Sequence, residues 1–279
     1  MADRLVTFQR DGLEFDVADT GPIEGDCVVL LHGFPQDATC WDQVAPQLHQ
    51  EGYRTLAPDQ RGYSPGARPS GAGSYRVREL VDDVLAMMDA AEVRSAHVVA
   101  HDWGAVVAWA LASDQPDRVS TLTNLSVPHP AAFKAAAWRG QAVRSWYMGL
   151  FQVRGASERV LRPGSRLWGQ FMKGLPEAFA AHYAARMSEP AALTGALSWY
   201  RALPLDLRHA SVRVGRIAVP TLYVWGARDP ALGRTAAEMT HQYVTADYRF
   251  EALPNAGHWL PEAHADDVTP LLLEHLRSV

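Results

Sequence analysis

Short apolar runs alternate with amphipathic helical patterns along most of this sequence, and this alternation limits the fold more than any other feature. Residues 27–31 are five apolar residues in succession, as is typical of a strand buried on both faces of a parallel sheet. Similar runs are 53–57, 96–100, 119–125, 221–225 and 248–253, and helical patterns occupy 41–51, 78–91, 105–111, 235–241 and 267–276. An Asp-Gly turn between alternating segments at 5–9 and 13–18 predicts an antiparallel hairpin. The sequence therefore predicts an α/β fold with a doubly wound, mostly parallel sheet.

One long interval breaks the alternation. Residues 128–213 show helical patterns without strand-like runs, and they are rich in aromatic side chains. We interpret this interval as a helical cap inserted over the carboxyl edge of a core formed by residues 1–127 and 214–279. Most of its aromatic residues are expected to form ordinary core, and a minority to line a pocket.

Composition and charge exclude several classes of function. The 26 basic and 31 acidic residues give a net charge of −5, so we expect no nucleic-acid partner and no membrane-surface partner. Cys27 and Cys40 are the only cysteines, which argues against a disulfide framework or a cysteine metal site and favours the cytoplasm. No signal peptide and no apolar run near the ~18 residues of a membrane span is expected. A small-molecule partner fits these properties best.

Asp102 occupies a predicted strand-to-helix junction in the sequence Ala-His-Asp-Trp-Gly-Ala at 100–105. Small residues two positions before it, and two and three after it, suit a sharp turn that exposes one side chain at its apex. Asp102 is therefore a candidate nucleophile. The alternative is that it N-caps the following helix.

Three further polar clusters follow strand-like runs: the loop 32–35 (His-Gly-Phe-Pro), Asp229 before Pro230, and His258 after Asn-Ala-Gly. In a doubly wound sheet such loops converge on one edge. The order nucleophile, acid, histidine resembles that of the α/β-hydrolase superfamily, and the resemblance covers almost the whole chain. For Asp229 the alternative is an ordinary turn residue before proline.

The resemblance implies an α/β-hydrolase fold with a catalytic triad. Asp102 is then the nucleophile, His258 the general base that activates water, and Asp229 the acid that orients the imidazole. The backbone N–H groups of Phe34 and Trp103 are the expected oxyanion-hole donors.

An aspartate nucleophile restricts the reaction. With an ordinary pKa near ~3.9, it is anionic at pH 7 and attacks an electrophilic sp³ carbon without a base. At the predicted strand-to-helix junction the sequence 100–104 reads Ala-His-Asp-Trp-Gly, so this junction lacks the serine nucleophile of the Gly-x-Ser-x-Gly pattern. Such an enzyme opens epoxides or displaces halides.

Two cap segments, 145–152 and 198–201, resemble those in which epoxide hydrolases carry their paired ring-opening tyrosines, here Tyr147 and Tyr200. This resemblance implies a cytoplasmic epoxide hydrolase with a detoxification role, which converts a hydrophobic epoxide and water to a vicinal diol through an ester on Asp102. No cofactor and no metal is expected. The side chains expected to line the substrate pocket are Phe34, Trp103, Trp146, Phe151, Trp199 and Trp259.

Other functions remain open at this point. Haloalkane dehalogenases share the Asp-Trp pair and use the tryptophan as a halide donor, but they commonly carry Asn at the position of Phe34. Fluoroacetate dehalogenases share the loop 32–36 but carry Arg at the position of Trp103. A third alternative is a hydrolase fold that has lost catalysis and serves as a ligand receptor. The natural substrate, enantiopreference, pathway and oligomeric state, a homodimer included, are not determined by the sequence.

Overall fold

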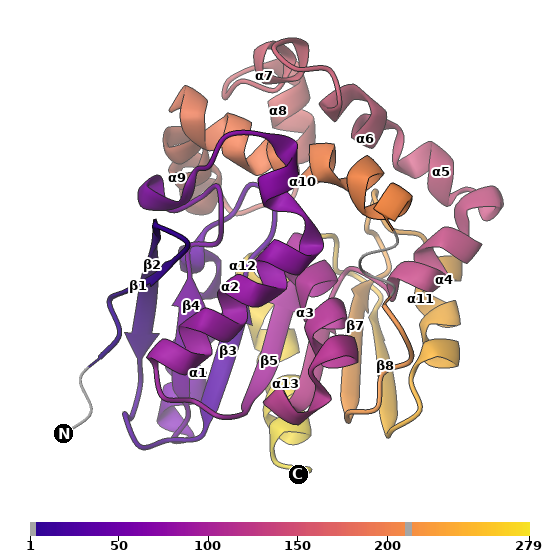
Figure 1. Ribbon diagram of the computed structural model, residues 1–279. Coiled ribbons are helices and arrows are strands. Elements are labelled where there is room, and N and C mark those ends of the chain that lie inside the picture. The colour runs from indigo at the N-terminus through magenta and orange to yellow at the C-terminus, as the bar shows by residue number, and fades with distance from the viewer. Residues whose placement is uncertain (1–3, 210–213) are drawn as a thin grey trace.

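The computed structural model describes residues 4–209 and 214–279, and its centre is an eight-stranded sheet (Figure 1). The strands lie in the order β1-β2-β4-β3-β5-β6-β7-β8. Their bounds are β1 (Thr7–Arg10), β2 (Leu13–Thr20), β3 (Cys27–Leu31), β4 (Arg54–Pro58), β5 (Ala96–His101), β6 (Val119–Leu125), β7 (Thr221–Gly226) and β8 (Tyr248–Leu253). Strand β2 is antiparallel to β1 and β4, and the other neighbours are parallel. This confirms the predicted α/β fold and mostly parallel sheet.

Helices cover the sheet as the alternation predicted. Helices α2 (Val77–Ala90) and α3 (Trp103–Asp114) pack against each other in front of the sheet in Figure 1, and α13 (Ala265–Leu276) lies behind it with α1 (Ala45–Gln50). Two shorter helices are α11 (Arg234–Met239) and α12 (Leu260–Ala263). The helix predicted over 41–51 is split into a 3₁₀ turn, η1 (Ala38–Trp41), and α1. The reason is Pro46 in the first turn of α1, which has no N–H for a helix continuing from Trp41.

The insertion between β6 and β7 is helical. It contains α4 (Pro130–Ala135), α5 (Gln141–Arg144), α6 (Trp146–Phe151), α7 (Ala156–Val160), α8 (Arg166–Phe171), α9 (Glu177–Met187) and α10 (Pro190–His209). In Figure 1 these helices form a layer above one end of the sheet. The predicted cap falls in this interval, but residues 210–213 lie outside the described part of the chain, so its boundary stays a prediction.

The cap is held close to the sheet edge by α10. A Cβ atom on Gly195 would lie 2.6 Å from the carbonyl oxygen of Gly62, so the close approach of α10 to the loop after β4 requires glycine. This contact fixes the height of α10 over the sheet.

None of the helices in the described residues is long and apolar enough to cross a bilayer.

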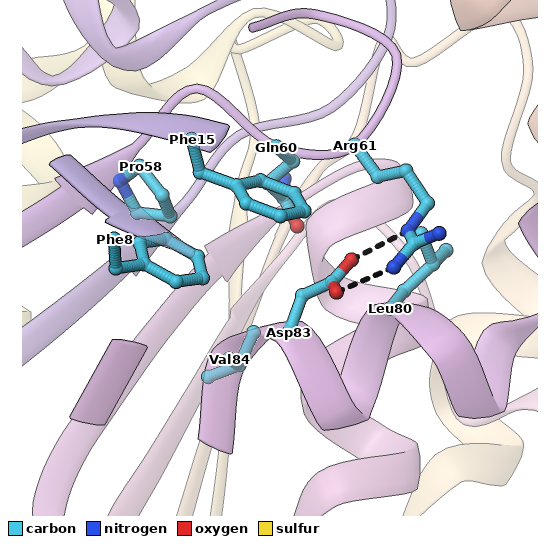
Figure 2. A pocket seen from close by; sticks show the side chains of 8 residues that line it. All are labelled: Phe8, Phe15, Pro58, Gln60, Arg61, Leu80, Asp83 and Val84. Atoms are coloured by element: carbon cyan, nitrogen blue, oxygen red, sulfur yellow. Dashed lines mark hydrogen bonds and ion pairs between the residues drawn. The ribbon is translucent and has the colours of Figure 1, made fainter. Parts of the chain in front are cut away.

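A buried ion pair anchors the loop after β4. Figure 2 shows the Arg61 guanidinium beside a small cavity, with two hydrogen bonds of 2.7 Å to the Asp83 carboxylate of α2. The adjacent Gln60 donates its backbone N–H to His32 Nε2 at 3.0 Å and its side-chain amide to the His32 carbonyl at 2.6 Å. The anchor therefore positions the loop after β3, which carries Phe34. None of the predicted site residues lines this cavity, so it is not the candidate site.

Candidate active site

Asp102 stands at a sharp turn between β5 and α3. Its backbone has φ 50° and ψ −120°, a conformation that non-glycine residues seldom adopt. Gly104 permits the turn, because a Cβ there would lie 2.3 Å from the carbonyl oxygen of Leu31. The Asp102 side chain makes no capping hydrogen bond to α3, so the alternative of an N-cap is wrong. Its carboxylate is directed instead to the Phe34 N–H and to His258.

The three predicted triad side chains meet at the carboxyl edge of the sheet. His258 Nδ1 lies 2.8 Å from Asp229 Oδ2, and His258 Nε2 lies 3.6 Å from Asp102 Oδ2. The side chains of Asp102 and His258 are 16% and 14% exposed, whereas that of Asp229 is 0% exposed. A substrate can therefore reach the first two, while the third is sealed.

The carboxylate of Asp229 both accepts the hydrogen bonds of its own turn and contacts His258. Its Oδ1 accepts hydrogen bonds from the backbone N–H groups of Ala231 at 2.7 Å and Leu232 at 3.0 Å, as a turn aspartate does. Its Oδ2 faces His258. The turn fixes the carboxylate, and the fixed carboxylate orients the imidazole.

The charges of the site favour an anionic nucleophile. Burial alone lowers the pKa of His258, but the charges of Asp229 and Asp102 and their hydrogen bonds outweigh it and raise that pKa to about 10. Burial alone raises the pKa of Asp102, but interactions with His258, His101 and the Phe34 N–H hold it below its ordinary value. At neutral pH the resting site therefore pairs an imidazolium with an ionised Asp102.

One of the two predicted oxyanion donors is already engaged. The Phe34 N–H donates to Asp102 Oδ1 at 2.7 Å, so Oδ2 is left facing His258. In the described residues no hydrogen bond joins the Trp103 N–H to the carboxylate. Because Trp103 begins α3, its N–H has no partner within the helix and stays available for an oxyanion.

Tyr147 of α6 and Tyr200 of α10 come together over the nucleophile. Their ring centroids are 6.1 Å apart, and the Tyr200 ring lies 5.0 Å from that of Trp103 and 5.5 Å from that of Phe34. Burial and the nearby Asp102 charge raise the pKa of both hydroxyls, so both remain protonated donors at neutral pH. The fold thus unites two tyrosines that are more than fifty residues apart in sequence.

The residues predicted to line the pocket fall into two groups. Phe34, Trp103 and Phe151 pack edge-on or tilted against Tyr200, next to the nucleophile. Trp199 and Trp259 are buried and lie behind the site, with ring centroids 5.6 Å from Trp103 and 5.2 Å from His258. Trp199 packs against Trp103 and Trp259 against His258, and the contact of either with substrate stays a prediction.

Trp146 departs from the expectation that it lines the pocket. It is 58% exposed, so most of its ring faces solvent. The physical reason is the helical repeat of α6, in which Tyr147 and Phe151, four residues apart, share the inward face. Trp146 is one residue before Tyr147, which is a rotation of about 100° around the helix, and so it points outward.

A buried polar network beneath the triad was not foreseen from the sequence. Gln36 Oε1 accepts from the Gly33 N–H at 2.8 Å and lies 2.9 Å from His101 Nδ1, while Gln36 Nε2 donates to Glu262 at 2.7 Å. The His101 Nε2 lies 2.9 Å from the His258 carbonyl oxygen. Gln36 therefore links the oxyanion loop to the strand of the nucleophile and to the helix after the base. The only sequence signal was the proximity of these polar residues to the predicted motifs.

Glu262 is the member of this network whose burial as a charged group is least favourable. Burial raises its pKa to about 7, against hydrogen bonds from Gln36 and from the Tyr183 hydroxyl at 3.0 Å. Its Oε2 has no hydrogen-bond partner among the described residues. Within the same residues, no group of three or more His, Cys, Asp or Glu is arranged to hold a metal ion.

Comparisons with known proteins identify the family of the chain. Residues 26–265 match the family described as the alpha/beta hydrolase fold. The chain is 33% identical to an AB hydrolase superfamily protein of Bacillus subtilis, over 96% of each chain. It is 31% identical to epoxide hydrolase A of Mycobacterium tuberculosis, over 99% of this chain and 98% of the relative.

A solved structure supports the same assignment. The crystal structure of epoxide hydrolase A from Mycobacterium thermoresistibile matches with a TM-score of 0.81 and 27% identity, over 98% of this chain and 97% of that one. The match spans the cap as well as the sheet. The chain therefore belongs to the α/β-hydrolase family and, within it, to the epoxide hydrolase family.

Proposed function

We propose that this protein hydrolyses hydrophobic epoxides to vicinal diols through a covalent ester on Asp102. One observation carries the proposal: an ionised Asp102, paired with the His258–Asp229 couple, lies beneath the two protonated tyrosines Tyr147 and Tyr200. A nucleophile without proton donors would suit a substrate whose leaving group departs as a stable anion. The paired tyrosines suit an oxygen that needs a proton.

Ring opening is the first step. Asp102 Oδ2 attacks a ring carbon, the carbon–oxygen bond breaks, and the oxygen takes a proton from Tyr147 or Tyr200. Asp229 and Asp102 both raise the pKa of His258, and alkylation removes the charge of Asp102. The imidazolium then passes its proton to the tyrosinate, so the tyrosine is restored with no net change in protons. The imidazole is then neutral and able to act as a base.

Hydrolysis of the ester is the second step. His258 takes a proton from a water molecule, which attacks the Asp102 carbonyl carbon. The developing charge falls on Oδ1, where the Phe34 N–H already donates, and the Trp103 N–H is available as the second donor. Collapse of the intermediate expels the diol oxygen, which takes the proton from His258 and leaves Asp102 as a carboxylic acid. Asp102 then passes its proton to His258, which restores the resting ion pair. Asp102 keeps one oxygen atom from water.

The environment of the nucleophile favours an apolar substrate. Phe34, Trp103 and Phe151 surround the tyrosines, and in the described residues no lysine or arginine forms an ion pair with Asp102, whose ionic partner is His258. Trp103 stands where a carboxylate-binding enzyme of the fluoroacetate type carries arginine. We propose on these grounds a neutral, hydrophobic epoxide.

Single-turnover hydrolysis in ¹⁸O-water tests the covalent route. The label is expected in the Asp102 carboxylate, found by mass spectrometry of the peptide, and the first-turnover diol is expected to be unlabelled. Label in that first diol would show direct attack by water and overturn the ester mechanism.

A paired assay tests the substrate class. Diol formation from a simple aryl epoxide and halide release from a bromoalkane are measured on the same enzyme. We expect the diol to form far faster. Halide release at the greater rate would identify a haloalkane dehalogenase, and absence of both would favour the receptor alternative.

We also propose a cytoplasmic detoxification enzyme with the cap bounded at residues 128–213. Cys27 and Cys40 are both free and buried, which fits a reducing compartment. Fractionation of the native host and limited proteolysis at the cap boundaries test these two points.

A further inference from the structure

The outer side of the cap exposes apolar side chains that the proposed reaction does not use. Of the seven large hydrophobic residues exposed in the described part of the chain, five lie between 138 and 160: Trp138, Val143, Trp146, Val153 and Val160. Trp138 is 97% exposed. They lie on η5 (Ala137–Arg139), α5, α6 and α7 and the turn between the last two, which follow one another around the outer rim of the cap in Figure 1. A concentration of this kind marks an interaction surface.

Basic side chains are concentrated in the same segment. Residues 134–173 contain eight, all exposed: Lys134, Arg139, Arg144, Arg154, Arg159, Arg162, Arg166 and Lys173. The one acidic residue, Glu158, is partly buried and pairs with Arg201 at 2.8 Å. No salt bridge in the described residues involves any of the eight, and Arg144 donates only to backbone carbonyls.

The overall charge of the chain conceals this segregation. Outside 134–173 the sequence holds 18 basic and 30 acidic residues. The expectation of no membrane-surface partner came from the net charge of −5, which averages a basic segment with a strongly acidic remainder. We call the exposed side chains of residues 134–173 the cap face.

We propose that the cap face docks on the surface of a lipid bilayer that contains anionic headgroups. Basic side chains are attracted to such a surface, and exposed tryptophan and aliphatic side chains enter the boundary between headgroups and acyl chains. Tryptophan is favoured at that depth because one edge is polar and the rest apolar. The cap face supplies both the basic and the apolar side chains for this contact. The remainder of the chain, which is acidic overall, would face away from the membrane.

Two other occupants fit the cap face less well. A symmetric dimer through this face would place eight basic side chains against the same eight, which repel. A nucleic acid would use tryptophans for stacking, but it has no use for exposed Val143, Val153 and Val160. An anionic bilayer satisfies the charges and the aliphatic side chains together.

Docking would bring α6 to the lipid surface. This helix presents Trp146 outward and Tyr147 toward Asp102, so one short helix joins the cap face to the proposed active site. Hydrophobic epoxides concentrate in a bilayer, and an enzyme docked there meets them at higher concentration. This last consequence rests on the proposed function, whereas docking itself does not.

Vesicle co-sedimentation of the full chain tests the proposal. The probes are phosphatidylcholine vesicles with and without about 30 mol% phosphatidylglycerol, in about 50 mM and about 0.5 M NaCl. We expect binding only to the anionic vesicles, and at least tenfold weaker binding at the higher salt concentration. Wild-type protein that stays in the supernatant with anionic vesicles at low salt would overturn the proposal.

Matched charge reversals locate the surface. The triple variant Arg154→Glu, Arg159→Glu and Arg162→Glu is expected to bind at least about 100-fold more weakly. The control triple variant Arg78→Glu, Arg94→Glu and Arg234→Glu makes the same change in net charge on exposed residues outside the cap. We expect the control to bind no more than about threefold more weakly. Equal losses in both would show a general charge effect and contradict a docking face.

One substitution of an apolar residue distinguishes docking on lipid from docking on a second copy of the chain. Trp138→Ser should weaken vesicle binding about tenfold, with an unchanged circular dichroism spectrum and unchanged diol formation from a water-soluble epoxide. Analytical ultracentrifugation without lipid provides the other arm. A dimer that Trp138→Ser dissociates would assign the cap face to self-association and overturn membrane docking.

Discussion

The two halves of the active site are built in different ways. On the sheet side, Asp229, His258 and Asp102 are each held by hydrogen bonds or ion pairs of 2.7 to 3.6 Å. On the cap side, Tyr147 and Tyr200 are placed by ring contacts with other aromatic residues, 4.8 to 6.1 Å between centroids. Hydrogen bonds fix the direction of a group, whereas ring packing fixes chiefly its position. A side-chain hydrogen bond with Trp103 also reaches the Tyr200 hydroxyl. We propose that the sheet side serves ester hydrolysis and the cap side holds the substrate oxygen.

The largest expected effect comes from breaking the sheet side. His258→Gln removes the base for the second step but leaves Asp102 able to attack. We expect steady-state turnover to fall about 10⁴-fold while one equivalent of alkylated protein accumulates, detected by intact-protein mass spectrometry.

Asp102→Ala is the matched control for that experiment. It is expected to be equally inactive and to form no adduct, because it lacks the nucleophile. If the His258→Gln protein stays unmodified after incubation with substrate, the assignment of Asp102 as nucleophile and His258 as base of the second step is contradicted.

The second largest effect comes from breaking the cap side. The double variant Tyr147→Phe and Tyr200→Phe should lose about 10³-fold or more in kcat without accumulating an ester, because ring opening itself is slowed. Tyr53→Phe, which lies outside the site, serves as the control. Near-normal activity in the double variant would remove the preference for epoxides over halides.

The charge pairing on the sheet side also predicts a pH dependence of stability. The pKa of His258 is raised from 6.5 to about 10 in the folded protein, because Asp229 and Asp102 outweigh the effect of burial. The folded state therefore binds this proton more tightly than the unfolded state, and the stabilisation is complete below pH 6.5 and lost as pH rises toward about 10. Urea denaturation across that range should show a decline in the free energy of unfolding that His258→Gln lacks. Parallel declines in both proteins would assign the effect to other groups.

The smallest expected effect concerns the network under the triad. Burial raises the pKa of Glu262 from 4.5 to about 7, so its ionisation destabilises the fold as pH rises through that interval. Glu262→Gln removes this titration. The free energy of unfolding of the variant minus that of wild type should be larger at pH 8 than at pH 5, by on the order of 1 kcal/mol. A difference that does not change between the two pH values would show that Glu262 titrates normally.

Much of the fold followed from local patterns. The alternating hairpin segments and the apolar runs together predicted every strand to within two residues, because a half-buried strand alternates with a period of two and a strand buried on both faces is continuously apolar. Asp102, His258 and Asp229 were found because each follows a strand, and a parallel sheet brings such positions to one edge. The helix over 41–51 was predicted too long, since the apolar spacing outweighed Pro46 in the prediction.

Other features depend on contacts that no local pattern contains. Which face of α6 turns inward was set by the packing of Tyr147 and Phe151 against Tyr200 of α10, and the helical repeat then left Trp146 outward. The links of Gln36 to His101 and Glu262 join residues up to 226 positions apart. The segregation of charge on the cap face was present in the sequence, but its exposure became visible only with the fold.

The sequence by itself predicted the order of the elements, an aspartate as the candidate nucleophile and the three candidate triad residues, because these depend on residue type and on position relative to a strand. Only the tertiary structure decided which face each cap aromatic presents, that Asp229 both shapes its turn and orients His258, and that a buried network underlies the site. The physical reason is that burial, direction and pKa are set by neighbours distant in the chain, and those neighbours are brought together only when the cap packs on the sheet.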